Sequence, residues 1–294
     1  GLVLSWSVRT SFELGRVSNL PTAWTNTAAG MLLSGAAVAD WRFPVLLLAM
    51  TAAYTGGMFL NDAFDAEIDA RERPERPIPS GKVSRRSVYL AGFSMLALSV
   101  LLVGTCALTE NGGGWTAVMS AIALCATITL YNAWHKGNTL SPVIMGACRL
   151  LVYITAGLSY TATPDVLLYL GATISLCYLI GLTYTAKQES LGEVRNMWPL
   201  LFLLTPVAFG LYALSSTLLV LLPLLLLLAW LLVVMRFLKR RQPGDIPRAV
   251  VSMIAGISLM DALFIATTGS LGWIMFCIAG FVTTIVLQKW ISGT

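Results

Sequence analysis

The chain has 294 residues, of which 57% are hydrophobic and only 11% are charged, and its net charge is +5. A soluble globular domain carries charge on roughly a quarter of its residues, so this composition excludes that class and indicates a membrane protein. The modest positive charge does not indicate nucleic-acid binding. We expect one all-helical transmembrane domain, residues 1–294, in contact with the lipid bilayer.

Ten apolar stretches are long enough to cross a bilayer as helices. Their expected ranges are 17–38, 44–63, 88–109, 115–133, 142–160, 166–186, 197–214, 217–237, 249–267 and 271–287. Gly269 and Gly272, at the junction of the last two stretches, could instead be a kink inside one re-entrant pair. The sequence therefore predicts a bundle of nine or ten spans.

The basic residues predict how the spans are oriented, because cytoplasmic loops carry an excess of Lys and Arg. With the N-terminus inside, eighteen of the nineteen Lys and Arg residues fall on the inner side, and only Arg42 falls outside. We expect no secretory leader among the first sixteen residues, which hold Arg9, Glu13 and Arg16 but no cleavage site after an apolar core. The expected location is a bacterial inner membrane or a plastid membrane, with the functional end on the cytoplasmic or stromal face.

The first span carries Asn26 inside an apolar run, where a side-chain amide must find a partner. Two roles fit equally well: a contact to substrate in the wall of a cavity, or a hydrogen bond between helices. Arg16, at the inner end of this span, is expected to anchor it at the inner face.

An acidic segment follows the second span, and six of the fourteen Asp and Glu residues lie between Asp62 and Glu75. Asp62, Asp65 and Asp69 are spaced i, i+3 and i+7, which places them on one face of a helix, with Asn61 at its edge. Like charges on one face repel, so the spacing makes sense if a divalent cation lies among them. Mg²⁺ takes one or two carboxylates together with water and substrate phosphate oxygens.

Three arginines, Arg71, Arg73 and Arg76, come directly after these carboxylates. The guanidinium fork matches the oxygens of a phosphate group. Carboxylates, an amide and arginines together predict a site for Mg²⁺ and a diphosphate. The alternative is a solvated charged loop between two spans.

The segment from Asn61 to Gly81 reads Asn-Asp-x-x-Asp-x-x-x-Asp and then, from Arg73, Arg-Pro-Glu-Arg-Pro-Ile-Pro-Ser-Gly. It resembles the first aspartate-rich motif of the UbiA-type intramembrane prenyltransferases, and the number and order of spans fit the same family. The resemblance implies a central cavity that holds an isoprenyl diphosphate, with its tail in the cavity and its head at the motif. It also implies that Asn61, Asp62, Asp65 and Asp69 bind Mg²⁺, and that the three aspartates act in catalysis.

Two basic residues of the next spans are candidate substrate contacts. Lys136 ends the fourth span and either reaches a diphosphate, as a similarly placed residue does in the resembled family, or only snorkels to the interface. Arg149 lies a turn or two inside the fifth span and needs a partner there. Pairing with a motif carboxylate is favoured slightly over phosphate binding. His135, the single histidine, is expected at the membrane interface.

The sixth span departs from the family pattern, because it lacks the second aspartate-rich motif and reads Tyr184-Thr-Ala-Lys187-Gln-Glu189 instead. Lys187 would replace a Mg²⁺ as the fixed positive charge on the diphosphate, with the Tyr184 hydroxyl as a further donor. Glu189 is another candidate substrate contact. The alternative is that Lys187 has no contact with substrate and only contributes to the excess of positive charge on the inner side, the role of a topology charge.

The expected function is Mg²⁺-dependent transfer of an isoprenyl group from an isoprenyl diphosphate to an acceptor, which the sequence does not identify. Arg73, Arg76, Lys136 and Lys187 would add positive charge around the leaving diphosphate. Two alternatives stay open: a terpene cyclase on the same scaffold, or a lipid-binding or transport protein that has lost the chemistry. Asp261, isolated in the ninth span, is given no catalytic role.

Overall fold

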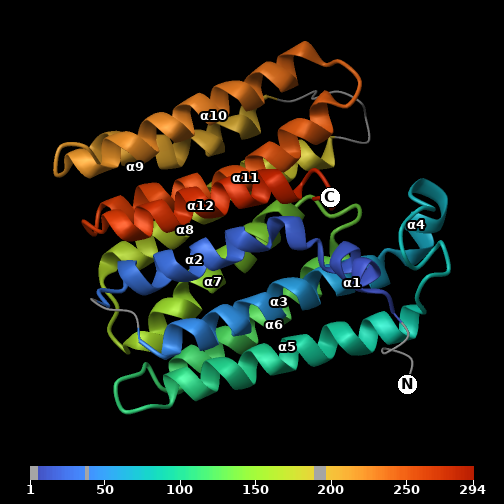
Figure 1. The fold of residues 1–294 in the computed structure, drawn as a ribbon, viewed down its shortest axis with the longest axis horizontal. Helices are drawn as coiled ribbons and strands as arrows, with labels where there is room; N and C mark the ends of the chain where they lie inside the picture. Colours follow the sequence, from blue (N-terminus) through green and yellow to red (C-terminus); the bar gives the residue numbers. More distant parts are fainter. Residues whose placement is uncertain (1–5, 37–39, 189–196) are drawn as a thin grey trace.

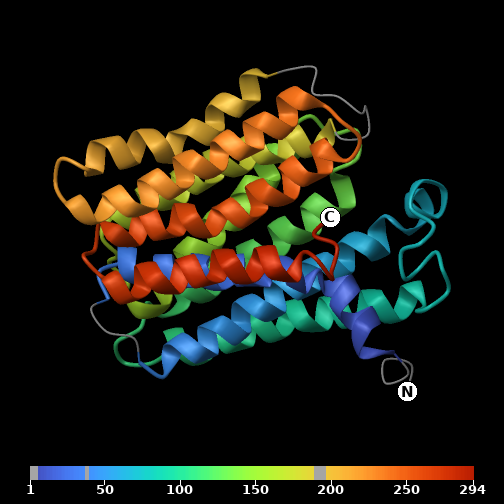
Figure 2. The same cartoon turned by 45° about the horizontal axis from the view of Figure 1, so that its top comes forward.

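The computed structural model describes residues 6–36, 40–188 and 197–294, and this part of the chain is helical without strands. Its long helices lie side by side, with loops at two opposite ends (Figures 1 and 2). The long helices are α3 (Arg42–Phe64), α5 (Arg85–Ala107), α6 (Trp115–Trp134), α7 (Ser141–Tyr160), α8 (Val166–Lys187), α10 (Leu221–Arg240) and α11 (Asp245–Ala266). The shorter ones are α1 (Val8–Gly15), α2 (Leu20–Leu33), α4 (Ala66–Glu72), α9 (Thr205–Ala213), α12 (Leu271–Leu287) and the 3₁₀ turns η2 (Val17–Asn19), η4 (Trp198–Leu204) and η5 (Leu218–Val220).

Each of the ten predicted apolar stretches contains helix, which confirms the predicted all-helical bundle. Within the described residues, seven helices are long and apolar enough to cross a membrane. The other three stretches form shorter helices: α2, η4 continued by α9, and α12. The last two stretches are separate helices, α11 and α12, joined by a turn in which Gly269 has a φ of 79°, a conformation that glycine adopts without strain.

The helices differ in how far they are buried inside the bundle. In the most apolar window of α11, 83% of the residues are buried, against 33% for the span that contains α10. The lipid tails are as apolar as leucine, so the leucine-rich surface of α10 is suited to face them. The buried α2 approaches α7 closely, and a Cβ at Gly30 would lie 2.6 Å from the carbonyl oxygen of Tyr153. This close packing lets polar side chains of α2, α7 and α11 meet inside the bundle.

The acidic motif lies where α3 leaves the bundle. The helix ends at Phe64, Asp65 is its C-cap, and α4 begins at the next residue. The motif therefore does not lie on one uninterrupted helix as the spacing predicts. Backbone hydrogen bonds from Asp65 N to Asn61 O (3.0 Å) and from Asp69 N to Asp65 O (2.8 Å) keep a nearly helical path across the break. All three aspartates stay buried, with exposed fractions of 4% to 6%.

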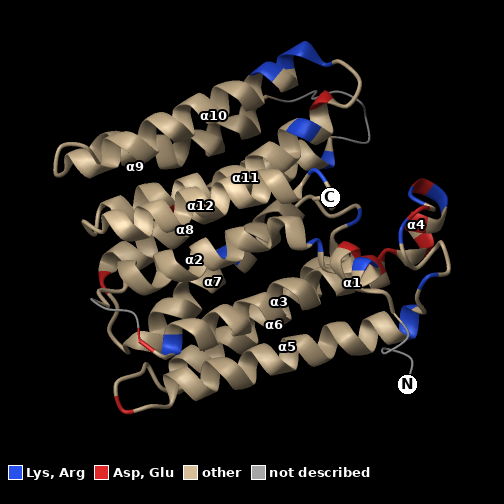
Figure 3. Ribbon diagram, viewed as in Figure 1, with Lys and Arg blue, Asp and Glu red and all other residues tan. Residues whose placement is uncertain are grey.

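Most Lys and Arg residues lie at the end of the bundle that carries α4 (Figure 3). Arg42 is the first residue of α3 and thus lies at the opposite end, where it pairs with Asp40 at 2.8 Å between Nη2 and Oδ2. Arg149 lies in the middle of α7, inside the bundle. The charge asymmetry predicted from the loops is thus seen in the arrangement of the helices.

Candidate functional site

Buried carboxylates and arginines meet at the charged end of the bundle. The Nη2 atom of Arg16 lies 3.0 Å from Oδ1 of Asp62. The Nη1 atom of Arg76 lies 3.0 Å from Oδ2 of Asp69 and 3.8 Å from Oδ1 of Asp62. A buried carboxylate is costly unless it is paired, and here the pairing comes from arginines of the same chain.

The third motif carboxylate, Asp65, faces His135. The Nε2 atom of the histidine lies 3.2 Å from Oδ2 of Asp65. Its Nδ1 atom lies 3.1 Å from the carbonyl oxygen of Tyr131 and 3.3 Å from that of Asn132. Both ring nitrogens therefore face oxygen atoms that can accept a hydrogen bond. His135, predicted to lie at the membrane interface, follows the last residue of α6 at the charged end of the bundle. It is only 8% exposed there and belongs to the group of side chains around the motif aspartates, called the motif cluster below.

Two asparagines join α3 to α6 beside these carboxylates. The Asn61 side chain accepts a hydrogen bond from Arg16 Nη2 at 2.8 Å and donates one to Asn132 Oδ1 at 3.1 Å. Asn132 in turn donates to the carbonyl oxygen of Gly57 at 3.0 Å. These bonds fix the orientation of the Asn61 amide, whose oxygen faces the arginine. Asn132 was not predicted, although an amide in the last turn of an apolar span was a visible signal.

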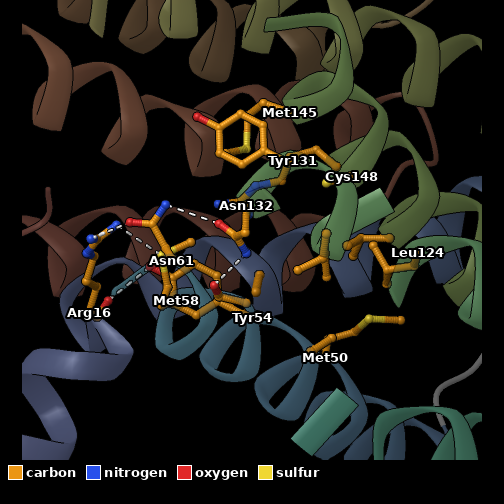
Figure 4. Close-up of a pocket in the computed structure, with 16 residues that line it drawn as sticks. Arg16, Met50, Tyr54, Met58, Asn61, Leu124, Tyr131, Asn132, Met145 and Cys148 are labelled. Atoms are coloured by element: carbon orange, nitrogen blue, oxygen red, sulfur yellow. Dashed lines mark hydrogen bonds between the residues drawn. The ribbon is translucent and has the colours of Figure 1, made fainter. Parts of the chain in front are cut away.

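A cavity of about 150 Å³ begins at these side chains. Arg16, Asn61 and Asn132 form the polar part of its wall, while Met50 and Leu124 belong to its apolar part. Figure 4 shows Arg16 and Asn61 on one side of the pocket and Met50 and Leu124 on the other. The wall comes from α2, α3, α6 and α7 together with Arg16. Such a cavity suits a ligand with an anionic head and an apolar tail.

Arg16 is a member of the site that the sequence did not reveal as one. It lies between α1 and η2 in a left-handed backbone conformation, with a φ of 45°. The hydroxyl of Tyr54 donates to its backbone carbonyl oxygen at 3.0 Å. Its side chain, 14% exposed, turns to Asp62 and the cavity. The predicted role of a simple inner-face anchor is therefore wrong.

Of the candidate residues in the sixth span, Lys187 reaches the motif cluster and Tyr184 does not. The Nζ atom of Lys187 donates to the carbonyl oxygen of His135 at 2.9 Å, and the ring of His135 in turn contacts Asp65. The hydroxyl of Tyr184 donates to the carbonyl oxygen of Thr139 at 3.3 Å, in the loop between α6 and α7. Glu189 lies outside the described residues.

The remaining basic candidates differ in how close they come to the motif. Arg76 lies within it, paired with Asp69 and near Asp62. Arg73 is the C-cap of α4 and is partly exposed, and Lys136 is exposed directly after His135.

Arg149 lines the cavity but does not pair with a motif carboxylate, so the favoured expectation for it is wrong. Its Nη1 atom donates to Oδ1 of Asn26 at 2.8 Å. Asn26 is fully buried and bonds to Tyr153 on α7 and Asp261 on α11. The interhelical role expected for Asn26 is therefore present, and the contact with Arg149 connects it to the cavity wall.

The donor atoms of the motif fit a hard cation such as Mg²⁺, although their arrangement does not yet form its site. Among the described residues, no group of three or more His, Cys, Asp or Glu side chains lies close enough to hold a metal ion. However, Nη1 of Arg76 already occupies a point 3.0 Å from Asp69 and 3.8 Å from Asp62. Two carboxylates that converge on one positive charge, with an amide oxygen nearby, provide the oxygen ligands that Mg²⁺ prefers.

A family model described as the UbiA prenyltransferase family matches residues 23–253. The digeranylgeranylglyceryl phosphate synthase of Methanopyrus kandleri is 32% identical over 216 residues, which cover 69% of this chain and 70% of that protein. Among eight curated relatives, six carry that name and two are protoheme IX farnesyltransferases. The matches span between 32% and 70% of the length of these relatives.

Two solved structures share the fold. The apo structure of a UbiA homolog from Aeropyrum pernix K1 has a TM-score of 0.66 and 14% identity, over 85% of this chain and 96% of that one. A UbiA homolog from Archaeoglobus fulgidus, bound to GPP and Mg²⁺, has a TM-score of 0.53 and 16% identity, over 90% of this chain and 99% of that one. At such identities the likeness concerns the fold.

Proposed function

Because this chain belongs to the UbiA prenyltransferase family, we propose that it transfers an isoprenyl group from an isoprenyl diphosphate to a lipid-type acceptor, with Mg²⁺ as cofactor. The observation that carries the proposal is the cavity, whose polar wall includes Arg16, the partner of the buried Asp62, and whose wall continues as apolar side chains. Helices from both halves of the chain pack against one another in the same bundle, through contacts such as Asn26 with Asp261. This supports the proposal that residues 1–294 form a single domain.

In the proposed complex the diphosphate lies at the mouth of the cavity and the isoprenyl tail lies inside it. Arg16, Asn61, Arg76 and Lys187 are the nearest donors for the phosphate oxygens, and Arg73 and Lys136 add positive charge around them. Asn61, Asp62, Asp65 and Asp69 would hold the Mg²⁺, which supplies neutralising charge to the leaving diphosphate when bound. Tyr184 and Glu189 remain proposed contacts at the end of α8.

The reaction exchanges one bond for another at C1 of the isoprenyl group. The bond from C1 to the diphosphate oxygen breaks, and its electron pair leaves with the diphosphate. The acceptor nucleophile forms the new bond to C1 and gives up its proton. Met50 and Leu124, in the apolar part of the wall, would help to keep water away from the allylic cation until the acceptor captures it.

The arginines pair with carboxylates in this structure, and in the proposed complex they would turn to the diphosphate. Arg16 pairs with Asp62, and Arg76 pairs with Asp69. We therefore expect the affinity for Mg²⁺ to rise at least tenfold, about 1.4 kcal/mol, when inorganic diphosphate is present. Titration calorimetry of the purified chain with and without diphosphate measures this difference.

Two variants control this expectation. Arg76→Gln frees Asp69 and should tighten Mg²⁺ binding in the absence of diphosphate, so that the gain from diphosphate shrinks. Arg86→Gln removes an exposed arginine at the same end of the bundle and should leave the gain unchanged. Equal Mg²⁺ affinity with and without diphosphate in the unaltered chain would contradict the exchange of partners.

The proposed activity is tested with the purified chain in lipid, supplied with labelled geranylgeranyl diphosphate, Mg²⁺ and a lipid extract. We expect release of diphosphate and a product whose mass is the sum of an acceptor and the isoprenyl group. A labelled hydrocarbon with no added acceptor would indicate a cyclase instead. Binding of the donor without release of diphosphate would indicate a binding or transport protein.

The chain is an integral membrane protein, and we propose that its charged end faces the cytoplasm or stroma. Ser80 and Asn111 are exposed residues in loops at opposite ends of the bundle. In a background without the native cysteines, a single cysteine at Asn111 should react with an impermeant thiol reagent from outside intact cells. A cysteine at Ser80 should react only after permeabilisation, and reaction of both from the same side would contradict the orientation.

A further inference from the structure

A buried polar network lies behind one wall of the cavity, where α2, α7 and α11 meet. Its centre is Asp261, whose side chain is fully buried. The carboxylate accepts hydrogen bonds from the Tyr153 hydroxyl, from Thr25 Oγ1 at 2.7 Å and from Asn26 Nδ2 at 2.6 Å. A carboxylate inside the bundle is costly, and three donors on two other helices hold this one.

The network fixes the direction in which the Asn26 amide faces. Its NH₂ group donates to Asp261 and, at 2.9 Å, to the hydroxyl oxygen of Tyr153. Its carbonyl oxygen then faces the other way and accepts a hydrogen bond from Arg149 Nη1 at 2.8 Å. A flipped amide would set NH₂ against a guanidinium, which has donors only. Asp261 therefore orients Arg149 through Asn26.

Arg149 keeps donors available for a ligand. A guanidinium has five N–H groups, and the hydrogen bond shown for Arg149 uses one of them, toward Asn26. In the described part of the chain, no nitrogen of Arg149 is buried without a partner, and Arg149 lines the cavity, where its remaining N–H groups can reach a ligand. The ring of Tyr54 lies 5.9 Å from its Cζ atom, and no described carboxylate pairs with it.

We propose that Arg149 binds an oxyanion of the acceptor, and that Asn26 and Asp261 are positioning residues for it. This proposal rests on the proposed function, because it names the acceptor class for the same cavity. A cation inside a bilayer is stabilised by an anionic partner, and the cavity holds Arg16 and Asn61 at its mouth for the donor head. The acceptor is then an amphiphile with a phosphate or carboxylate group, and a neutral lipid alcohol is a poor substrate.

The test measures binding of two pairs of probes to the purified full chain in lipid nanodiscs. The first pair is a monoprenyl glyceryl phosphate and the same lipid without its phosphate. The second pair is 4-hydroxybenzoate and its methyl ester. In at least one pair the charged probe should bind tenfold or more tightly than its neutral twin, and the pair that shows this preference identifies a phosphate or a carboxylate as the ligand.

Variants then connect the preference to the network. Arg149→Gln should abolish the preference for the charged probe, and Arg149→Lys should retain part of it. Asp261→Asn should lower the preference at least threefold, although Asp261 does not line the cavity. Thr25→Val is the matched control, since it also removes a hydrogen bond to Asp261 but leaves the contact of Asn26 with Arg149. It should keep the preference within twofold, with thermal unfolding confirming that each variant folds.

The same preparations are titrated with geranyl diphosphate and Mg²⁺, which separates this inference from the proposed function. The variants should bind this donor within threefold of the unaltered chain. Donor binding without any preference for a charged probe would overturn the inference alone, as would a preference that survives Arg149→Gln. An unchanged preference in Asp261→Asn would overturn the positioning role. Failure of the unaltered chain to bind the donor would count against the proposed function instead.

Discussion

Replacing Asp62 with asparagine is expected to lower turnover on the order of 100-fold while the chain still folds. That factor corresponds to about 2.7 kcal/mol of transition-state stabilisation, a loss that one carboxylate of a catalytic metal site can account for. Asp62 is 4% exposed and lies between Arg76 and Arg16, and Arg16 lines the cavity. The measurement is kcat with a labelled isoprenyl diphosphate at saturating Mg²⁺.

The control for this prediction comes from the same segment. Glu67 is an exposed carboxylate in α4, so Glu67→Gln should leave turnover within twofold. Asparagine has nearly the shape of aspartate and can still accept a hydrogen bond from Arg16, so thermal unfolding should change little. Normal turnover in the double variant Asp62→Asn, Asp65→Asn would rule out the proposed metal site.

Replacing Lys187 with alanine is expected to weaken binding of the donor about 30-fold, or about 2 kcal/mol, because its charge would be paired with a desolvated diphosphate. Lys187 already reaches the motif cluster, where it donates to the carbonyl oxygen of His135. A lysine cannot bind a cation, so its part in the site must be contact with the anion itself. The dissociation constant of geranyl diphosphate, measured by calorimetry, tests this.

Three further variants separate an anion contact from a topology charge. Lys239→Ala removes an exposed lysine at the same end of the bundle and should leave donor affinity unchanged. Tyr184→Phe should have a smaller effect than Lys187→Ala, because its hydroxyl bonds to the loop at Thr139. Lys187→Asp should bind the donor only at high Mg²⁺, by creating a new metal ligand. Unchanged donor affinity in Lys187→Ala would leave Lys187 as a topology charge.

The fold was predictable from the sequence because hydropathy and charge act locally along the chain. An apolar stretch in lipid must satisfy its own backbone hydrogen bonds, so each of the ten stretches had to become helical. The positions of Lys and Arg then placed the loops at one end or the other. The lengths were less predictable: α2, which covers Leu20–Leu33, is shorter than its predicted stretch of 17–38, because helix ends depend on packing and capping.

The aspartates of the site were recognisable because their spacing is local, but their partners were not. Asp62 pairs with Arg16, which is 46 residues away, and Asp65 faces His135, 70 residues away along the chain. Each of these partners comes from a distant part of the chain, so no local sequence pattern indicates it. Arg16 looked like an interfacial anchor and His135 like an interfacial ring because the sequence shows only their neighbours.

Asp261 shows the same limit in the membrane interior. An isolated aspartate in an apolar span indicates a buried contact but does not tell which helix supplies the partner. Its donors, Thr25, Asn26 and Tyr153, come from α2 and α7, and only the packed bundle brings them together. The link from Asp261 to the cavity through Arg149 follows from these three-dimensional contacts.

The most direct test of the proposed function is a structure of this chain with Mg²⁺ and a geranyl diphosphate analogue that resists ionisation. We predict that the diphosphate lies within hydrogen-bond distance of Arg16 and Asn61, with the geranyl chain between Met50 and Leu124. Metal density should lie at Asp62 and its neighbouring aspartates, with none on α8 beside Lys187. An analogue bound outside this cavity, or a second metal bridging the diphosphate to α8, would contradict the account.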